Sequence, residues 1–132
     1  MAAVLLDTDV FSFLFKQDSR AERYAAHLIG HVPCLSFMTV AELTRWALER
    51  KWGPKRRASL RARIVEATIV DYDMETSEAW ARIAVERCRA GRPIACGDCW
   101  IAACAVRHDI PLVTHNARHY AGISGLKVLT GT

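Results

Sequence analysis

The sequence predicts an α/β fold, a three-layer α/β/α sandwich built on a central, mainly parallel sheet. Short apolar runs that suit buried strands alternate along the chain with longer segments of helical periodicity. The composition fits this class, because 52% of the residues are hydrophobic and 24% are charged. A length of 132 residues suits a single domain, which we place over residues 1–132.

Five short apolar runs are expected to form the strands. The first ends abruptly at Asp7, and the fifth carries the weakest signal. In chain order, the expected strands are Ala2–Leu6, Cys34–Ser36, Thr68–Val70, Leu112–Thr114 and Lys127–Leu129. Because helical segments separate the first four strands, their connections are crossovers and the strands are expected to run parallel.

Six segments have the apolar spacing or the end signals of helices. Thr8 and Asp9 are good N-cap residues for the first helix, and Gly30, Gly53 and Gly91 end or interrupt later ones. In chain order, the expected helices are Thr8 to about Phe15, about Ser19–Ile29, Thr39 to about Lys51, about Lys55–Ala67, Glu75–Arg89 and Asp98 to about His108.

Two features bear on the cellular location. The longest stretch without formal charge, residues 25–41, is interrupted by His, Gly and Pro, and only Val4–Leu6 precedes the first acid. A membrane span needs about 18 apolar residues and a signal peptide needs a longer apolar core, so we expect a cytoplasmic protein without a membrane partner.

The five cysteines are expected to be small buried residues. Their number is odd, and the pair Cys96 and Cys99 lacks the second ligand pair that a structural zinc site requires. A disulfide framework, a zinc site and a redox motif are therefore all disfavoured.

Polar residues follow three of the expected strands, at the sheet edge where α/β proteins bind ligands. Asp7 follows the first strand, Glu42 lies in the first turns of the helix after the second, and Thr114 and Asn116 follow the fourth. We treat this edge as the candidate site.

Asp98 is expected to point inward. It lies three and four residues before Ile101 and Ala102, on the apolar face of its helix. Burial beside other carboxylates would be costly without a cation, and carboxylate oxygens suit Mg²⁺ or Mn²⁺. The alternative is that Asp7 and Asp98 are ordinary helix caps and that Glu42 is a solvated helix residue, since spacings of 35 and 56 residues do not show that the three meet.

Four blocks of sequence resemble the PIN-domain ribonucleases, in particular the VapC toxins of bacterial toxin–antitoxin pairs. They are Leu5–Val10, Ser36–Leu43, Gly91–Ile94 leading to Asp98 and Ile101–Ala103, and Leu112–Asn116. They occur in the family's order and at its spacing, and they span nearly the whole chain.

The resemblance implies hydrolysis of RNA by a Mg²⁺- or Mn²⁺-dependent endoribonuclease, with Asp7, Glu42, Asp98 and Asn116 as catalytic residues. Asp7 and Asp98 would hold the metal, and Thr8 and Thr114 would position water or phosphate. Relatives often carry a fourth Asp where this chain has Asn116 or, a few residues later, His119. Both residues are candidates to replace that acid here, and neither brings a carboxylate.

The family's precedent also implies partners: an RNA substrate, a second copy in a homodimer, a VapB-like antitoxin and, only through that antitoxin, operator DNA. Two alternatives stay open at this point. One is a catalytically impaired RNA-binding or regulatory module, and the other is a metal-dependent phosphohydrolase that acts on DNA or nucleotides.

The net charge of +4 is distributed unevenly. Residues 45–63 hold eight Lys or Arg and one acid, a net charge of +7, so the rest of the chain carries −3. RNA phosphates are a natural target for such a segment, and we expect Arg45, Lys55, Arg56 and Arg57 to bind RNA, in part near the rim of the site. The alternative is a solvated helical face.

Overall fold

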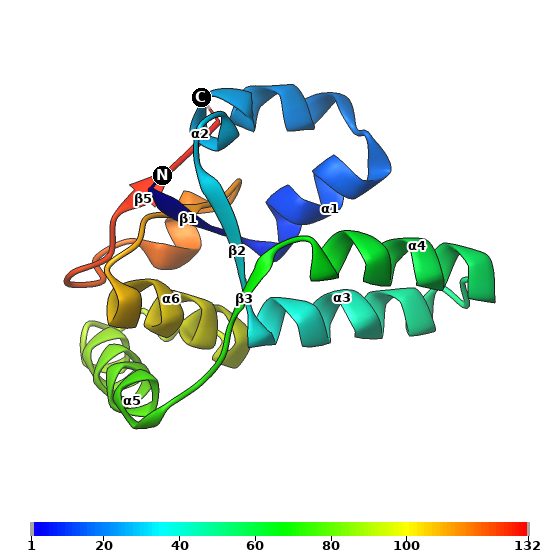
Figure 1. Cartoon of the computed structure of the whole chain (residues 1–132). Helices are drawn as coiled ribbons and strands as arrows, with labels where there is room; N and C mark the ends of the chain where they lie inside the picture. Colours follow the sequence, from blue (N-terminus) through cyan, green and yellow to red (C-terminus); the bar gives the residue numbers. More distant parts are fainter. Residues whose placement is uncertain (1, 132) are drawn as a thin grey trace.

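Five parallel strands form the central sheet of the protein, described here for residues 2–131 from a computed structural model (Figure 1). The strands are β1 (Ala3–Leu6), β2 (Val32–Ser36), β3 (Thr68–Val70), β4 (Leu112–Val113) and β5 (Val128–Leu129). Their order is β3-β2-β1-β4-β5, and every neighbouring pair is parallel. The predicted parallel sheet is confirmed, with β1 at its centre.

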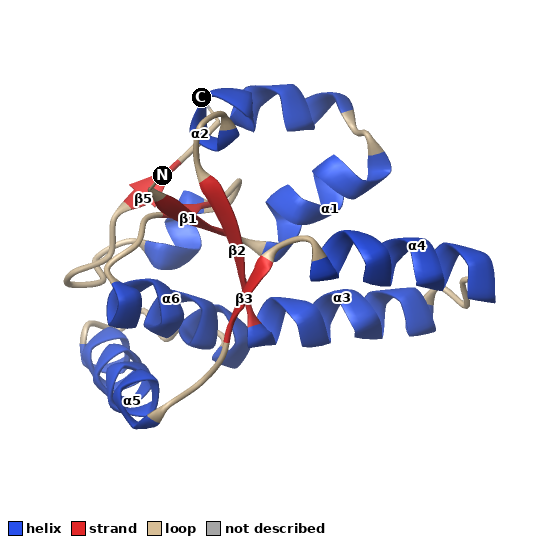
Figure 2. Cartoon of the chain, in the orientation of Figure 1, coloured by secondary structure: helices blue, strands red, loops and turns tan. Residues whose placement is uncertain are grey.

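Helices cover both faces of the sheet (Figure 2). They are α1 (Thr8–Lys16), α2 (Ala25–Leu28), α3 (Phe37–Glu49), α4 (Pro54–Val65), α5 (Met74–Arg89) and α6 (Cys96–His108), with two 3-10 turns, η1 (Ser19–Tyr24) and η2 (Ala117–Tyr120). Alternate residues of each strand face opposite layers. Leu6 and Leu35 pack with α1, α3 and α4, whereas Leu5 and Cys34 pack with α5 and α6. The three-layer sandwich is therefore confirmed.

The structure corrects two helix predictions. The helix expected over Ser19–Ile29 is instead the 3-10 turn η1 followed by the single turn α2. The Asp18 carboxylate accepts from the Arg20 N–H and the Asp18 carbonyl from the Ala21 N–H, which favours the tighter turn. The last long helix begins at Cys96, so Asp98 is its third residue and not its cap.

The cysteine prediction is right for three residues and wrong for two. All five thiols are unpaired, with Cys34, Cys99 and Cys104 buried and Cys88 and Cys96 exposed. Cys88 lies near the solvent-facing end of α5, and Cys96 lies in the first turn of α6. Within residues 2–131, no helix is long and apolar enough to cross a bilayer.

The carboxyl edge of the sheet gathers the candidate residues because three strands end there beside a turn or helix start. Asp7 follows β1 and is the N-cap of α1, while Ser36 ends β2 and is the N-cap of α3. Thr114 follows β4, which pairs directly with β1. The central position of β1 thus places Asp7 between the residues that follow β2 and those that follow β4.

Candidate active site

Asp7 is the buried centre of the candidate site, with only 6% of its surface exposed. One carboxylate oxygen, Oδ1, accepts from the Thr8 N–H at 2.8 Å. The other, Oδ2, accepts from the Thr114 hydroxyl at 2.7 Å and from the Tyr120 hydroxyl at 3.0 Å. Asp7 is therefore a helix cap, as the simpler interpretation holds, and also the focus of contacts from the far end of the chain.

The surroundings of Asp7 disfavour its negative charge. Burial raises the pKa of Asp7, and the charge of Asp98 adds to that effect. The hydrogen bonds from Thr114, Thr8 and Tyr120 act in the opposite direction. The pKa remains above its usual value, because the three donors do not fully replace the lost water.

Asp98 reaches the same cluster from α6, as its inward-facing position predicts. The Tyr120 hydroxyl lies 3.2 Å from Asp98 Oδ1, so this one group contacts both Asp7 and Asp98. On the other side, His119 Nδ1 lies 3.3 Å from Asp98 Oδ2. Asp98 and Asp7 are thus joined through a single hydroxyl oxygen.

Glu42 approaches the two aspartates from α3. The Thr8 hydroxyl donates to Glu42 Oε1 at 2.6 Å and lies 3.0 Å from the Thr39 hydroxyl. The glutamate also packs against the first turn of α6, where a Cβ on Gly97 would stand 2.9 Å from Glu42 Oε2. Burial raises the pKa of Glu42, and the charges of Asp7 and Asp98 raise it further. The structure therefore brings the three predicted acids together.

Asn116 lies beside an acid that the sequence analysis considered only as a helix cap. The Asn116 side-chain amide donates to Asp9 Oδ2 at 2.8 Å, and its backbone N–H donates to the Thr114 hydroxyl at 3.0 Å. Burial, followed by the charge of Asp7, raises the pKa of Asp9 to about 6. The available signal was its position, two residues after Asp7 in the first turn of the helix that Asp7 caps.

Tyr120 is the second residue that the sequence analysis missed. It ends η2, a 3-10 turn in a region without apolar periodicity, and its side chain is 2% exposed. Nothing in the local pattern distinguishes its hydroxyl from that of a surface tyrosine, because the partners are 113 and 22 residues away.

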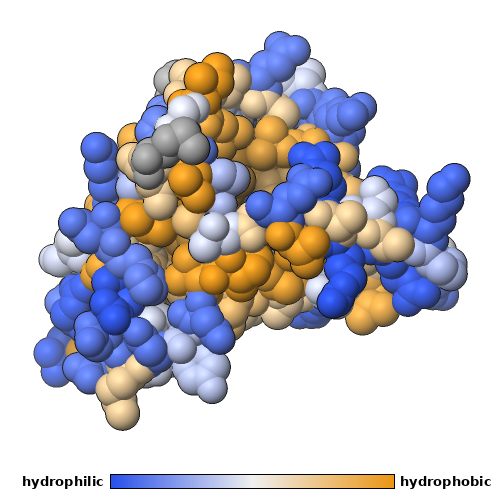
Figure 3. All heavy atoms as spheres, in the orientation of Figure 1, coloured by the Kyte–Doolittle hydropathy of each residue, from blue (hydrophilic) through white to orange (hydrophobic). Residues whose placement is uncertain are grey.

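Three of the basic residues expected to bind RNA lie away from the acids. Lys55, Arg56 and Arg57 open α4 at the end of the α3–α4 pair that lies farthest from the sheet (Figure 1). That end of the pair is strongly hydrophilic (Figure 3). Glu42 is the sixth of the 13 residues of α3, so the far end of the helix lies about 10 Å along its axis from this acid, and α4 begins beyond it.

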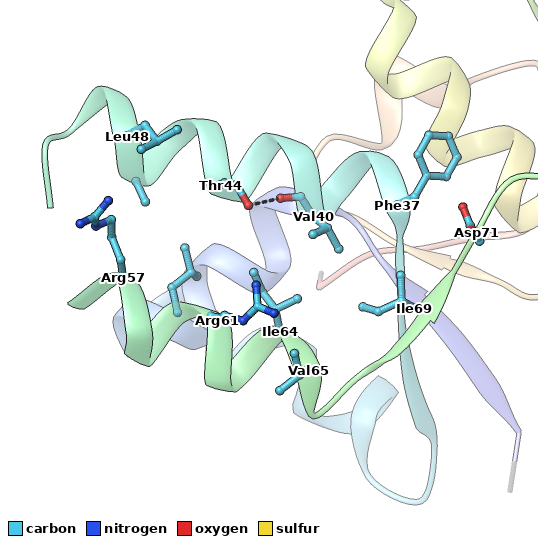
Figure 4. A pocket seen from close by; sticks show the side chains of 12 residues that line it. Phe37, Val40, Thr44, Leu48, Arg57, Arg61, Ile64, Val65, Ile69 and Asp71 are labelled. Carbon is cyan, nitrogen blue, oxygen red and sulfur yellow. Dashed lines mark hydrogen bonds between the residues drawn. The ribbon is translucent and has the colours of Figure 1, made fainter. Parts of the chain in front are cut away.

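Three of the basic residues expected to bind RNA have neighbours within the protein. Arg45 pairs with Glu49 at 3.3 Å, and the Arg56 guanidinium lies 3.9 Å from the centre of the Trp52 ring. Arg57 lines a largely apolar cavity of about 470 Å³ between α3, α4 and β3 (Figure 4).

A different basic pair shares a groove with Asp9. Lys16 and Arg50 line a groove of about 330 Å³ together with Thr8, Asp9 and Trp46. Of the +7 segment, it is therefore Arg50 that reaches the rim of the site.

The donor set fits a divalent cation held in part by water. Within residues 2–131, no three His, Cys, Asp or Glu side chains form a ready metal cage. In the same residues, no Lys or Arg forms an ion pair with Asp7, Glu42 or Asp98. Magnesium is commonly bound by one or two carboxylates and several waters, and Asp7 and Asp98 offer such a pair with uncompensated charge.

Comparison with known proteins gives consistent matches along the chain. A family model described as PIN domain matches residues 4–122. The tRNA(fMet)-specific endonuclease VapC of Shigella flexneri is 27% identical, with 96% of both chains covered. Ribonuclease VapC4 of Mycobacterium tuberculosis is 32% identical, with 96% of this chain and 95% of that protein covered. The crystal structure of DNA-bound VapBC from Salmonella typhimurium covers 100% of both chains at 27% identity, with a TM-score of 0.83.

Proposed function

Because this chain belongs to the PIN-domain family, among its VapC ribonucleases, we propose that it is the toxin of a toxin–antitoxin pair and cleaves RNA with the help of Mg²⁺ or Mn²⁺. The observation that carries the proposal is the cluster of buried Asp7 with half-buried Glu42 and Asp98, held by neutral hydroxyl groups at the carboxyl edge of the sheet. Uncompensated carboxylates in a buried site are stabilised when a cation binds.

Each side chain has a distinct role in the proposed reaction. Asp7 and Asp98 would hold the cation, which when bound polarises a phosphate oxygen and lowers the pKa of water. Glu42 would orient the attacking water or take its proton, and burial, which raises its pKa, makes its carboxylate a stronger base. Thr8 keeps the Glu42 carboxylate in place, and Thr114 does the same for Asp7.

Asp9 and Asn116 complete the donor set on the β4 side. Their hydrogen bond places a carboxylate next to the residue where the family often has its fourth acid. We propose that Asp9 supplies the negative charge that Asn116 lacks. His119 instead contacts Asp98 and would orient that ligand.

The proposed partners follow from the related proteins. The Salmonella complex contains VapB and DNA, so we propose that a VapB-like antitoxin binds this chain and carries it to operator DNA. The homodimer and the cytoplasmic location stay predictions. The Shigella relative is named for tRNA(fMet), which makes transfer RNA the first substrate to test.

Asp98→Asn tests the catalytic proposal. The substitution removes one carboxylate charge and keeps the side-chain shape, so cleavage of transfer RNA in Mg²⁺ or Mn²⁺ is expected to fall by at least about 100-fold, with the melting temperature retained. Asp109→Asn is the matched control, because Asp109 ends the same helix in a left-handed conformation that Asn tolerates. Full activity of the Asp98 variant, or cleavage that persists in EDTA, would contradict the proposal.

A further inference from the structure

The hydroxyl of Tyr120 is the only group among residues 2–131 with hydrogen bonds to both Asp7 and Asp98. It lies 3.0 Å from Asp7 Oδ2 and 3.2 Å from Asp98 Oδ1. A phenol has one proton to donate, so it is shared between two acceptors that repel each other. The two carboxylates thereby gain a common neutral hydrogen-bond partner.

The fold holds this hydroxyl in place from behind. The Tyr120 ring is buried in the core layer that contains α5 and α6. The buried guanidinium of Arg87 donates to the carbonyls of His119 and Ala121, on either side of Tyr120. Arg87 belongs to α5 and also donates to the Arg92 carbonyl at 2.7 Å, just beyond the end of that helix. The turn η2 is therefore fixed relative to α5, and Tyr120 with it.

We propose that Tyr120 is a positioning residue that sets the separation and orientation of Asp7 and Asp98 for a divalent cation. The inference rests on the metal dependence proposed above and assigns a role to a residue outside the acidic set. Among residues 2–131, Asp7 Oδ1 accepts one hydrogen bond, from the Thr8 N–H, and Asp98 Oδ2 has one polar partner, His119. These two oxygens can bind a cation while Asp7 Oδ2 and Asp98 Oδ1 keep their hydrogen bonds to the Tyr120 hydroxyl.

A purely structural hydroxyl would have a different effect. Its loss would leave a buried carboxylate with one donor fewer and would lower stability, without a specific effect on cation affinity. Groups that orient metal ligands through hydrogen bonds typically change metal affinity by about 10- to 100-fold when they are removed. Metal affinity therefore separates the two roles.

The experiment compares Mn²⁺ binding to the wild type, Tyr120→Phe and Tyr24→Phe, measured by electron paramagnetic resonance without RNA. Tyr24 is the matched control, since it is equally buried but its hydroxyl contacts His115 and none of the three acids. We expect the dissociation constant for Mn²⁺ to rise at least about tenfold in Tyr120→Phe and to remain at the wild-type value in Tyr24→Phe. In the RNA cleavage assay, the Mn²⁺ concentration for half-maximal activity is expected to rise in parallel.

Three results would be adverse. Equal Mn²⁺ affinity of Tyr120→Phe and the wild type overturns this inference and leaves the proposed function intact. A wild type that cleaves RNA in EDTA and binds no Mn²⁺ overturns both. If Tyr120→Phe does not fold, the ¹³C resonance of the Tyr120 Cζ in the wild type decides: Mg²⁺ is expected to shift it and leave that of Tyr24 unmoved, and an unmoved Tyr120 signal overturns the inference.

Discussion

Asp9 accepts three hydrogen bonds, yet burial holds its pKa at about 6. Its unfolded-state pKa is near 3.8, so the folded protein keeps the Asp9 proton over a pH range in which the unfolded chain has released it. Between about pH 4 and pH 6 the unfolded state binds fewer protons, and stability falls as the pH rises. Above pH 6 the destabilising effect is complete and constant.

Asp9→Asn is expected to remove this destabilisation. In the metal-free protein, the variant should melt at a higher temperature than the wild type at pH 7.5, because no charge has to be buried. The advantage should decline as the pH falls from 6 and vanish near pH 4, where folded Asp9 is already neutral. Thermal melts across this range, with Asp109→Asn as the control, provide the measurement, and a difference independent of pH would contradict the assignment.

At the scale of elements, the contact of α3 with the first turn of α6 determines where Glu42 lies. Gly97 makes that contact possible, because a Cβ there would stand 2.9 Å from Glu42 Oε2 and 3.3 Å from Met38 Cε. Gly in a helix interior costs about 0.5–1 kcal/mol relative to Ala, and Gly97, the second residue of α6, carries a part of that cost. The glycine therefore favours the approach of the acid over the stability of the helix.

Gly97→Ala is expected to separate these two effects. The added methyl group should displace the Glu42 carboxylate and lower RNA cleavage by about 10- to 100-fold, while the melting temperature changes little. Gly53→Ala is the control, since no atom lies within 4 Å of a Cβ at that position. Activity and melting temperature are measured on the same preparations, and unchanged cleavage by Gly97→Ala would show that Glu42 has room to move.

At the scale of the whole molecule, the positive charge and the acidic cluster occupy separate regions. The +7 segment forms the outer part of the α3–α4 pair, and the acids lie where that pair meets the sheet. An extended RNA bound along α3 would therefore span from the cluster to the first turn of α4. Lys16 and Arg50, in the groove beside Asp9, mark the first part of such a path.

Replacing Arg56 and Arg57 with Gln tests the distant part of this path. RNA binding is expected to weaken, and the slope of log affinity against log salt should fall by about one for each phosphate that the protein no longer neutralises. Arg89→Gln with Arg92→Gln is the control, because it removes the same charge from the end of α5. If the two double variants weaken RNA binding by the same amount, the net charge alone governs binding and the basic segment is a solvated face.

The sequence predicts the strands and helices of this molecule better than it predicts the full set of residues in its site. Strands and long helices follow from apolar periodicity, and Asp98 points inward because its helix has one apolar face. The turn η1 was missed because local hydrogen bonds of Asp18 override the helical pattern. Tyr120 and the role of Asp9 depend on contacts with residues about 100 positions away, which no local pattern encodes.

The bond between Thr114 and Asp7 joins the residue that follows β1 to the residue that follows β4, 107 positions later. A ribosome-bound chain that has emerged only as far as α5 lacks Asp98, Thr114 and Tyr120, and its Asp7 has no neighbour from β4. Domains generally fold as units once enough of the chain is free. The acidic cluster is thus assembled only after Tyr120 has left the ribosome, so a shorter nascent chain has no complete site for the proposed nuclease activity.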